Sequence, residues 1–182
     1  MRSEPNRLLE SAKIVALCIF TSIVYGVLHD QITIRLCPEY FSKWAFHADV
    51  FNHPNLTVVA LFWGIAATWW VGLLLGIPLA FVSTTRDAGW WTWRRLVKPL
   101  SVFITLLSLC AAIGYFISKW TSFRANPYAL NYSPDSEAEL AAFSQVLVTH
   151  NVSYIGGAIG GLILVGFVWK RRSKPVWQSI SR

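Results

Sequence analysis

Charged side chains are scarce in this sequence. Asp, Glu, Lys and Arg make up 14% of the 182 residues, whereas an ordinary soluble domain holds about 25%. Hydrophobic residues account for 54% of the chain, and ten of them are Trp. A soluble fold needs a polar shell to cover so much apolar surface, and the charges for that shell are missing. The composition therefore excludes an ordinary soluble domain and predicts a membrane protein.

Cysteine is also scarce, and the short motifs of common metal and redox sites are absent from the sequence. Cys18 and Cys110 fall inside apolar stretches, where Cys behaves as a small hydrophobe. Only Cys37 lies outside them, as an exposed residue, so we expect neither an intrachain disulfide nor a CxxC redox motif. No HxxxH or HExxH motif is present. A metal site in this chain would have to combine residues that lie far apart in the sequence.

Four apolar stretches are long enough to cross a bilayer, which takes about 20 residues each. The second is the longest, and we expect it to bend near Pro78. The predicted fold is therefore all-α: a single transmembrane domain, 1–182, that forms a bundle of four membrane-spanning helices. The predicted spans are 14–36, 56–82, 100–118 and 152–169, joined by outer loops 37–55 and 119–151 and a cytoplasmic loop 83–99.

The chain carries a net charge of +7, and the positions of its basic residues predict which way the spans point across the membrane. Lys and Arg gather before the first span, between the second and third, and after the fourth, whereas the other two loops carry few, offset by Asp and Glu. The positive-inside rule then places both termini in the cytoplasm of a bacterial inner membrane. Because the basic residues flank apolar stretches and form no stripe on a soluble face, nucleic acid is not a predicted partner.

The outer loops carry patterns of their own. Ser133 and Pro134 are typical of a helix start, and hydrophobic residues then recur at helical spacing: Leu140, Phe143 and Leu147. We expect a short amphipathic outer helix over about 134–149, on the membrane surface or across the mouth of the bundle. The aromatic-rich loop 37–55 should pack against the span ends, with a helix break at Pro38.

Aromatic and basic residues alternate where the third span begins. Rings at that depth lie among lipid headgroups, and guanidinium groups meet lipid phosphates. The sequence therefore predicts an anchor at the lipid interface that consists of Trp90, Trp91, Trp93, Arg94 and Arg95.

Glycine pairs in two spans predict close helix packing. The fourth span opens with Gly156, Gly157, Gly160 and Gly161. The second span holds Gly72 and Gly76, and helix backbones approach closely where side chains are missing. We expect the fourth span to pack on the second, and a homodimer or partner-subunit seam is the alternative.

The end of the first span is unusually polar. His29 and Asp30 lie about 22–24 Å along the helix from Ile14, still within the outer leaflet, where ionisable groups are costly unless paired. An up-and-down bundle brings the outer span ends together, so distant His and carboxylate residues should meet there. The candidate metal or haem ligands are His29, Asp30, Glu39, His53 and His150. The polar cluster around them should contain Tyr25, Arg35 and Tyr154, and Arg35 should pair with Glu39 if the helix continues to Pro38.

Three interpretations of this cluster stay open. It is a structural network in an accessory or structural membrane protein, which could serve as a subunit of a larger assembly. Alternatively, it binds a metal or haem and is redox-linked. A third interpretation is a site for a small transported solute. The sequence names no catalytic residue.

Several stretches together resemble a group of small, uncharacterised bacterial membrane proteins. The resemblance rests on four stretches and covers about half of the chain: 29–40, Trp63-Gly64, Thr68-Trp69-Trp70 and 150–154. It implies a four-span inner-membrane protein of unassigned function. It assigns no ligand and no catalytic role to any residue.

Overall fold

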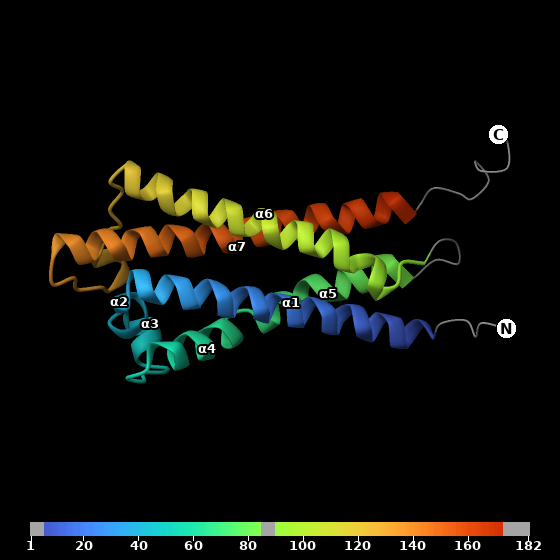
Figure 1. The fold of residues 1–182 in the computed structure, drawn as a ribbon, viewed down its shortest axis with the longest axis horizontal. Coiled ribbons are helices and arrows are strands. Elements are labelled where there is room, and N and C mark those ends of the chain that lie inside the picture. The colour runs from blue at the N-terminus through green and yellow to red at the C-terminus, as the bar shows by residue number, and fades with distance from the viewer. Residues whose placement is uncertain (1–5, 85–89, 173–182) are drawn as a thin grey trace.

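The computed structural model describes residues 6–84 and 90–172, and helices make up most of them (Figure 1). No strand occurs within these two ranges. In chain order the helices are α1 (Arg7–Leu36), α2 (Glu39–Ser42), α3 (Ala45–Ala48), α4 (Leu56–Ala66), α5 (Trp69–Thr84), α6 (Trp93–Trp120), the 3-10 helix η1 (Tyr128–Leu130) and α7 (Glu137–Arg172).

Four spans are long and apolar enough to cross a membrane: α1, α4 with α5, α6, and α7. They run up and down, so both described chain ends lie together at one end of the molecule, which we call the terminal end (Figure 1). The opposite end carries α2, α3 and η1, and we call it the histidine end. The predicted all-α, four-span fold is confirmed.

Helix α1 begins and ends where local chemistry requires. The side chain of Asn6 caps its start by accepting hydrogen bonds from the backbone N–H groups of Leu8 and Leu9. The helix ends at Leu36, and Cys37 is extended because a residue before proline avoids the helical region. The predicted break at Pro38 is therefore confirmed.

The second span is interrupted at Ala67 and Thr68, between α4 and α5, and the expected bend near Pro78 stays a prediction. Pro78 lies inside α5. At the interruption, the Thr68 hydroxyl donates to the carbonyl of Gly64, and the Thr68 N–H turns to the carbonyl of Ile65, three residues back. A side chain that bonds to the carbonyl four residues back often bends a helix, and here the backbone N–H has also shifted its acceptor.

The glycines of the second span pack against the first span. A Cβ on Gly72 would lie 2.6 Å from the Cα of Ile19, and one on Gly76 would lie 3.0 Å from the Cα of Val15. Neither position has room for a side chain, so α5 and α1 form a close pair. The fourth span contacts the second as expected, but these two glycines take no part in it, because consecutive antiparallel helices pack first on each other.

The glycines of α7 divide between two environments. A Cβ on Gly156 would meet Leu107 at 2.9 Å, and one on Gly160 would meet Phe103 at 2.5 Å, so these two glycines face α6. A Cβ on Gly157 would have no atom within 4 Å, and one on Gly161 would meet Leu75 of α5 at 3.3 Å. The bundle therefore consists of two close pairs, α1 with α4–α5 and α6 with α7. The homodimer seam stays a prediction.

The expected separate outer helix is the beginning of α7. This helix runs unbroken from Glu137, and its cap is Ser136, whose hydroxyl accepts the N–H of Glu139 at 3.1 Å. The predicted start at Ser133 was three residues early. Phe143 is completely buried, so this segment packs inward and does not lie on the surface.

Two hydrophobic cores lie at opposite ends of the bundle. The histidine-end core is rich in aromatic residues: Ile34, Cys37, Tyr40, Phe41, Val59, Ala60, Trp63, Tyr132, Phe143 and Val146. The terminal-end core is mainly aliphatic: Ile14, Cys18, Leu79, Ala80, Val82, Leu96, Leu100, Leu164 and Val168. Cys37 is completely buried, so its expected exposure is wrong.

The predicted lipid anchor precedes and begins α6. The guanidinium of Arg94 lies over the ring of Trp93, and that of Arg95 donates to the carbonyl of Trp90. Trp91 and Trp93 also pack against the terminal-end core. Two of the three Trp rings therefore hold protein together, and lipid contact by this segment stays a prediction.

Candidate functional site

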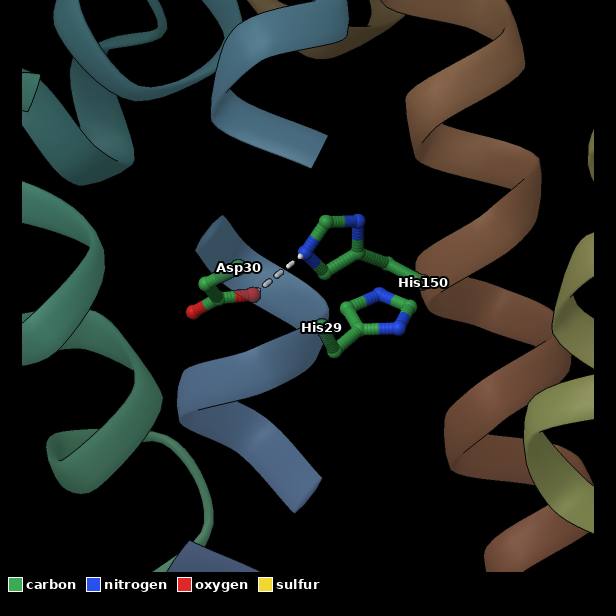
Figure 2. Close-up of side chains that lie close together, drawn as sticks. All are labelled: His29, Asp30 and His150. Atoms are coloured by element: carbon green, nitrogen blue, oxygen red, sulfur yellow. Dashed lines mark hydrogen bonds and ion pairs between the residues drawn. The ribbon is translucent and has the colours of Figure 1, made fainter. Parts of the chain in front are cut away.

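His29, Asp30 and His150 meet inside the histidine end (Figure 2). The first two lie on α1 and the third on α7. One potential ligand atom from each residue lies within 4.8 Å of those of the other two. The chain therefore brings together three of the five predicted metal ligands, across two helices that belong to different pairs.

Asp30 and His150 form a buried pair. The Nε2 atom of His150 lies 3.2 Å from Oδ1 of Asp30, and the two residues are 8% and 5% exposed. The other ring nitrogen of His150, Nδ1, lies 2.9 Å from the carbonyl oxygen of Val146. Because a carbonyl only accepts, Nδ1 carries the proton there. This bond aims Nε2 at Asp30 and fixes the ring.

His29 lies beside this pair but is not bonded to it. Its ring meets the ring of His150 edge-on, with centroids 4.7 Å apart and planes at 87°. Its Nε2 atom is buried and has no hydrogen-bond partner among the described residues. A buried polar atom without a partner costs about 1–3 kcal/mol. A bound ion would explain such an atom, because a carboxylate and a second imidazole lie beside it.

Aromatic rings cover the site toward the histidine end. Tyr40 stacks on His150 with centroids 4.7 Å apart and planes at 22°. His47 bonds through Nδ1 to the carbonyl of Tyr40 at 3.1 Å. Burial lowers the pKa of His47 to about 4 and raises the pKa of Tyr40. The cover therefore excludes water, and His47 is neutral within it at pH 7.

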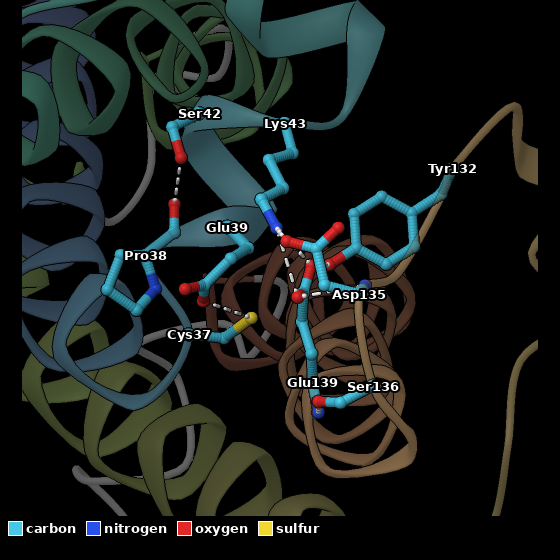
Figure 3. A network of polar contacts seen from close by, with 9 residues as sticks. All are labelled: Cys37, Pro38, Glu39, Ser42, Lys43, Tyr132, Asp135, Ser136 and Glu139. Atoms are coloured by element: carbon cyan, nitrogen blue, oxygen red, sulfur yellow. Dashed lines mark hydrogen bonds and ion pairs between the residues drawn. The ribbon is translucent and has the colours of Figure 1, made fainter.

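An ionic network ties this cover to α7 (Figure 3). The ammonium of Lys43 bonds to the carboxylates of Asp135 and Glu139, and these hydrogen bonds raise the pKa of Lys43. The hydroxyl of Tyr132 donates to Glu139 as well. Because α7 also carries His150, the network links the position of the cover to one side of the site.

Two of the predicted polar residues lie beside the site. Tyr25 shares a hydrogen bond of 2.8 Å with the hydroxyl of Ser153, which joins α1 to α7. Tyr154 is 44% exposed and lines a cavity that also touches His29. Ser153 lies one turn after Thr149 on the same face of α7, and its hydroxyl donates to the Thr149 carbonyl at 3.0 Å.

Three predicted residues lie elsewhere. Arg35 is exposed and bonds to Gln31 and to the hydroxyl of Thr57 at 3.2 Å, so its expected pairing with Glu39 does not form. The helix ends between them, which removes the one-turn spacing that such a pair needs. Glu39 instead accepts a bond from the Cys37 thiol.

His53 is also outside the site. It is exposed and accepts the backbone N–H of Asn55 at 3.0 Å, just before α4 begins. Its role is therefore local, because it shapes the turn into a helix whose cap is Asn55.

A cavity of about 470 Å³ reaches the site from between the two helix pairs. Its lining is mostly apolar, and its polar end contains His29, Asp30 and His150. A second cavity, of about 580 Å³, lies between α1 and α6 and is also lined by Tyr25 and His29. The side chains of Tyr25 and His29 therefore line both cavities.

Comparison of the chain with protein-family models, with curated proteins and with solved structures found no match. The resemblance to small uncharacterised membrane proteins stays a prediction. Because function resides in sites and not in a fold, the geometry of the site carries the functional argument.

Proposed function

We propose that this protein binds a divalent transition-metal ion within the membrane, through His29, Asp30 and His150. The observation that carries the proposal is the convergence of three ligand atoms within 4.8 Å, where the buried Nε2 of His29 has no other partner. This function is an alternative to the purely structural role that the sequence favours.

The donor set suits such an ion. Two imidazole nitrogens and one carboxylate oxygen are ligands that Zn²⁺ and Fe²⁺ accept. Metal–ligand distances of about 2.0–2.2 Å place neighbouring ligand atoms about 3–4 Å apart, so small side-chain rotations would close the site. The bond from His150 Nδ1 to the Val146 carbonyl already orients Nε2 as a ligand.

Charge also favours an ion over a haem. Asp30 supplies a negative charge against the ion, and binding would replace the proton that the Asp30–His150 contact now holds. The rings of His29 and His150 touch edge-to-face, which leaves no space for a macrocycle between them. The ligand set therefore supports a bare ion, coordinated from two helices.

We also propose that the histidine end faces away from the cytoplasm of a bacterial inner membrane. The support is the clustering of Lys and Arg in the segments at the terminal end, including Arg94, Arg95 and Lys98. Cysteine labelling in intact cells tests this orientation. A Ser122→Cys variant should react with an impermeant maleimide, and an Arg94→Cys variant should not. The opposite result would reverse the orientation.

Metal analysis of the protein purified in mild detergent tests the metal proposal. The wild type should hold about one ion per chain, and His29→Ala and His150→Ala should lose most of it, because each removes one of three ligands. His53→Ala is the matched control and should keep the ion. A chelator should lower the melting temperature of the wild type but not that of His29→Ala.

Two results would overturn the metal proposal. Equal metal content in all four proteins would show that the ion binds elsewhere. Absence of metal from the wild type, together with loss of stability in His150→Ala, would show that the cluster only cross-links α1 and α7. That outcome would favour the accessory or structural role.

A further inference from the structure

We infer that the 470 Å³ cavity binds a neutral membrane-soluble molecule with a hydrogen-bonding ring and a long apolar tail, the class of the prenylated quinones. The site shares His29, Asp30 and His150 with the proposed metal centre, but it does not depend on a bound metal. Cavities of about 300–1,000 Å³ are the usual size for small-molecule sites.

The cavity has the length and polarity that such a molecule needs. Along α7 it extends from His150 to Val165, which at ~1.5 Å per residue is about 22 Å. Its polar groups gather toward the end that holds His150. The opposite end is lined by apolar residues such as Pro78 and Val165. One end therefore fits a polar ring, and the rest fits a tail.

The chemistry of the polar end selects a neutral ring. The hydroxyls of Tyr25 and Ser153, which bond to each other at 2.8 Å, line it together with Thr68 and Tyr154. Ser153 and Thr68 already donate to the carbonyls of Thr149 and Gly64, so the groups that can donate to a ligand carbonyl are the Tyr154 hydroxyl and the ring Nε2 of His29. Neither Lys nor Arg is among the described residues that line the cavity, so a phosphate headgroup would lack a counter-charge. A phospholipid acyl chain alone would leave the polar end unused.

The access route lies between α5 and α7. Lining residues from both helices are also exposed on the surface of the bundle: Trp70 and Leu74 from α5, and Tyr154 and Leu162 from α7. In a membrane this surface meets hydrocarbon, so an apolar molecule could enter sideways without crossing water.

Gly157 keeps this route open. It lines the cavity, and a Cβ built there has no atom within 4 Å. Glycine inside a helix costs about 1 kcal/mol relative to alanine, and no helix packs closely against this position to require it. The missing side chain leaves room for a ligand, and a larger residue would fill that room.

Quinone content per chain tests the inference. The protein is purified in mild detergent from membranes, and extracted lipids are quantified by mass spectrometry for three proteins: wild type, Gly157→Leu and Gly166→Leu. Gly166 is a matched control, because it lies on the same helix, has open space at its Cβ and does not line the cavity. The wild type and Gly166→Leu should retain quinone, and Gly157→Leu should retain at least tenfold less.

Equal quinone content in Gly157→Leu and Gly166→Leu would overturn the inference. It would also fail if the molecule displaced by Gly157→Leu were a phospholipid. If Gly157→Leu does not fold, Ala158→Phe obstructs the same opening, and binding of a quinone with a decyl tail is then compared by quenching of Trp fluorescence.

Metal analysis of the same samples separates this inference from the proposed function. Gly157 lies about two turns from His150, so Gly157→Leu should lose quinone and keep its metal. Quinone that is retained by a metal-free wild type and lost from Gly157→Leu would support the cavity site without the metal site. Metal without any quinone would leave only the metal site.

Discussion

Each end of the bundle buries a carboxylate, and the two carboxylates differ in their hydrogen-bond partners. At the terminal end, Glu10 is 6% exposed, and its two oxygens are bonded to Lys13 at 3.0 Å and to the N–H of Trp93 at 3.3 Å. At the histidine end, Asp30 is 5% exposed and bonds to His150, while the adjacent His29 keeps a buried nitrogen without a partner. Both oxygens of the Glu10 carboxylate are therefore satisfied within the chain, whereas the imidazole of His29 beside Asp30 is not.

The two carboxylates also differ in their surroundings. The partner of Glu10 is a half-exposed Lys that reaches water, and the terminal-end core behind it is aliphatic. The partner of Asp30 is a buried His, and aromatic rings cover it. Natural proteins accept such unfavourable burial mainly where function requires it. The comparison therefore supports the proposed ligand site at the histidine end.

Replacement of each carboxylate by alanine gives the largest expected difference. Asp30→Ala should lower the free energy of unfolding by about 3–5 kcal/mol, because it leaves His150 buried without its partner. Glu10→Ala should cost only about 1 kcal/mol, since Lys13 can turn to water. Thermal unfolding in detergent measures both. Equal losses would erase the distinction between the two ends.

The aromatic cover gives the next effect. Phe143 is completely buried and stacks on Tyr132 with centroids 3.9 Å apart. Phe143→Ala should cost about 3–5 kcal/mol because it leaves a cavity in the histidine-end core. Phe116→Ala is the control, since that ring is 65% exposed on the bundle surface. A similar melting temperature for both variants would contradict a packed cover.

Acid should weaken the histidine end. The pKa of His47 is lowered by burial to about 4, against about 6.5 in an unfolded chain. The unfolded state therefore binds the proton first, so the stabilising contribution is present above pH 6.5 and is lost as the pH falls toward 4. Between pH 7.5 and 5 the expected loss is about 2 kcal/mol. Melting curves of wild type and His47→Phe should converge as the pH falls, and parallel curves would contradict this assignment.

The smallest effect is expected for Lys43, in the exposed network of Figure 3. Lys43→Ala should lower the melting temperature only slightly, and high salt should reduce the difference, because exposed ion pairs are weak and screened. Lys98→Ala is a control in which the network stays intact. A large loss in Lys43→Ala would show that the network, and not the aromatic packing, holds the cover in place.

The part of the site that lies on a single helix was predicted directly from the sequence. His29 and Asp30 are neighbours on a long apolar helix, so their depth followed from counting residues. His150 was found because an up-and-down bundle returns the start of the fourth span to the same layer. Glu39 and His53 were misplaced, since their positions depend on how the loop after Leu36 folds, and that loop has no periodic pattern.

The four spans, and the placement of both termini at one end, were determined by the sequence itself. Hydrocarbon requires long apolar runs with internally bonded backbones, and such runs can be read along one dimension. The tertiary structure alone decided which helix faces meet. The glycines, the interruption at Thr68, the cover over His150 and the cavity beside Gly157 all depend on packing between residues far apart in the chain, and packing is settled only when all four helices are in place.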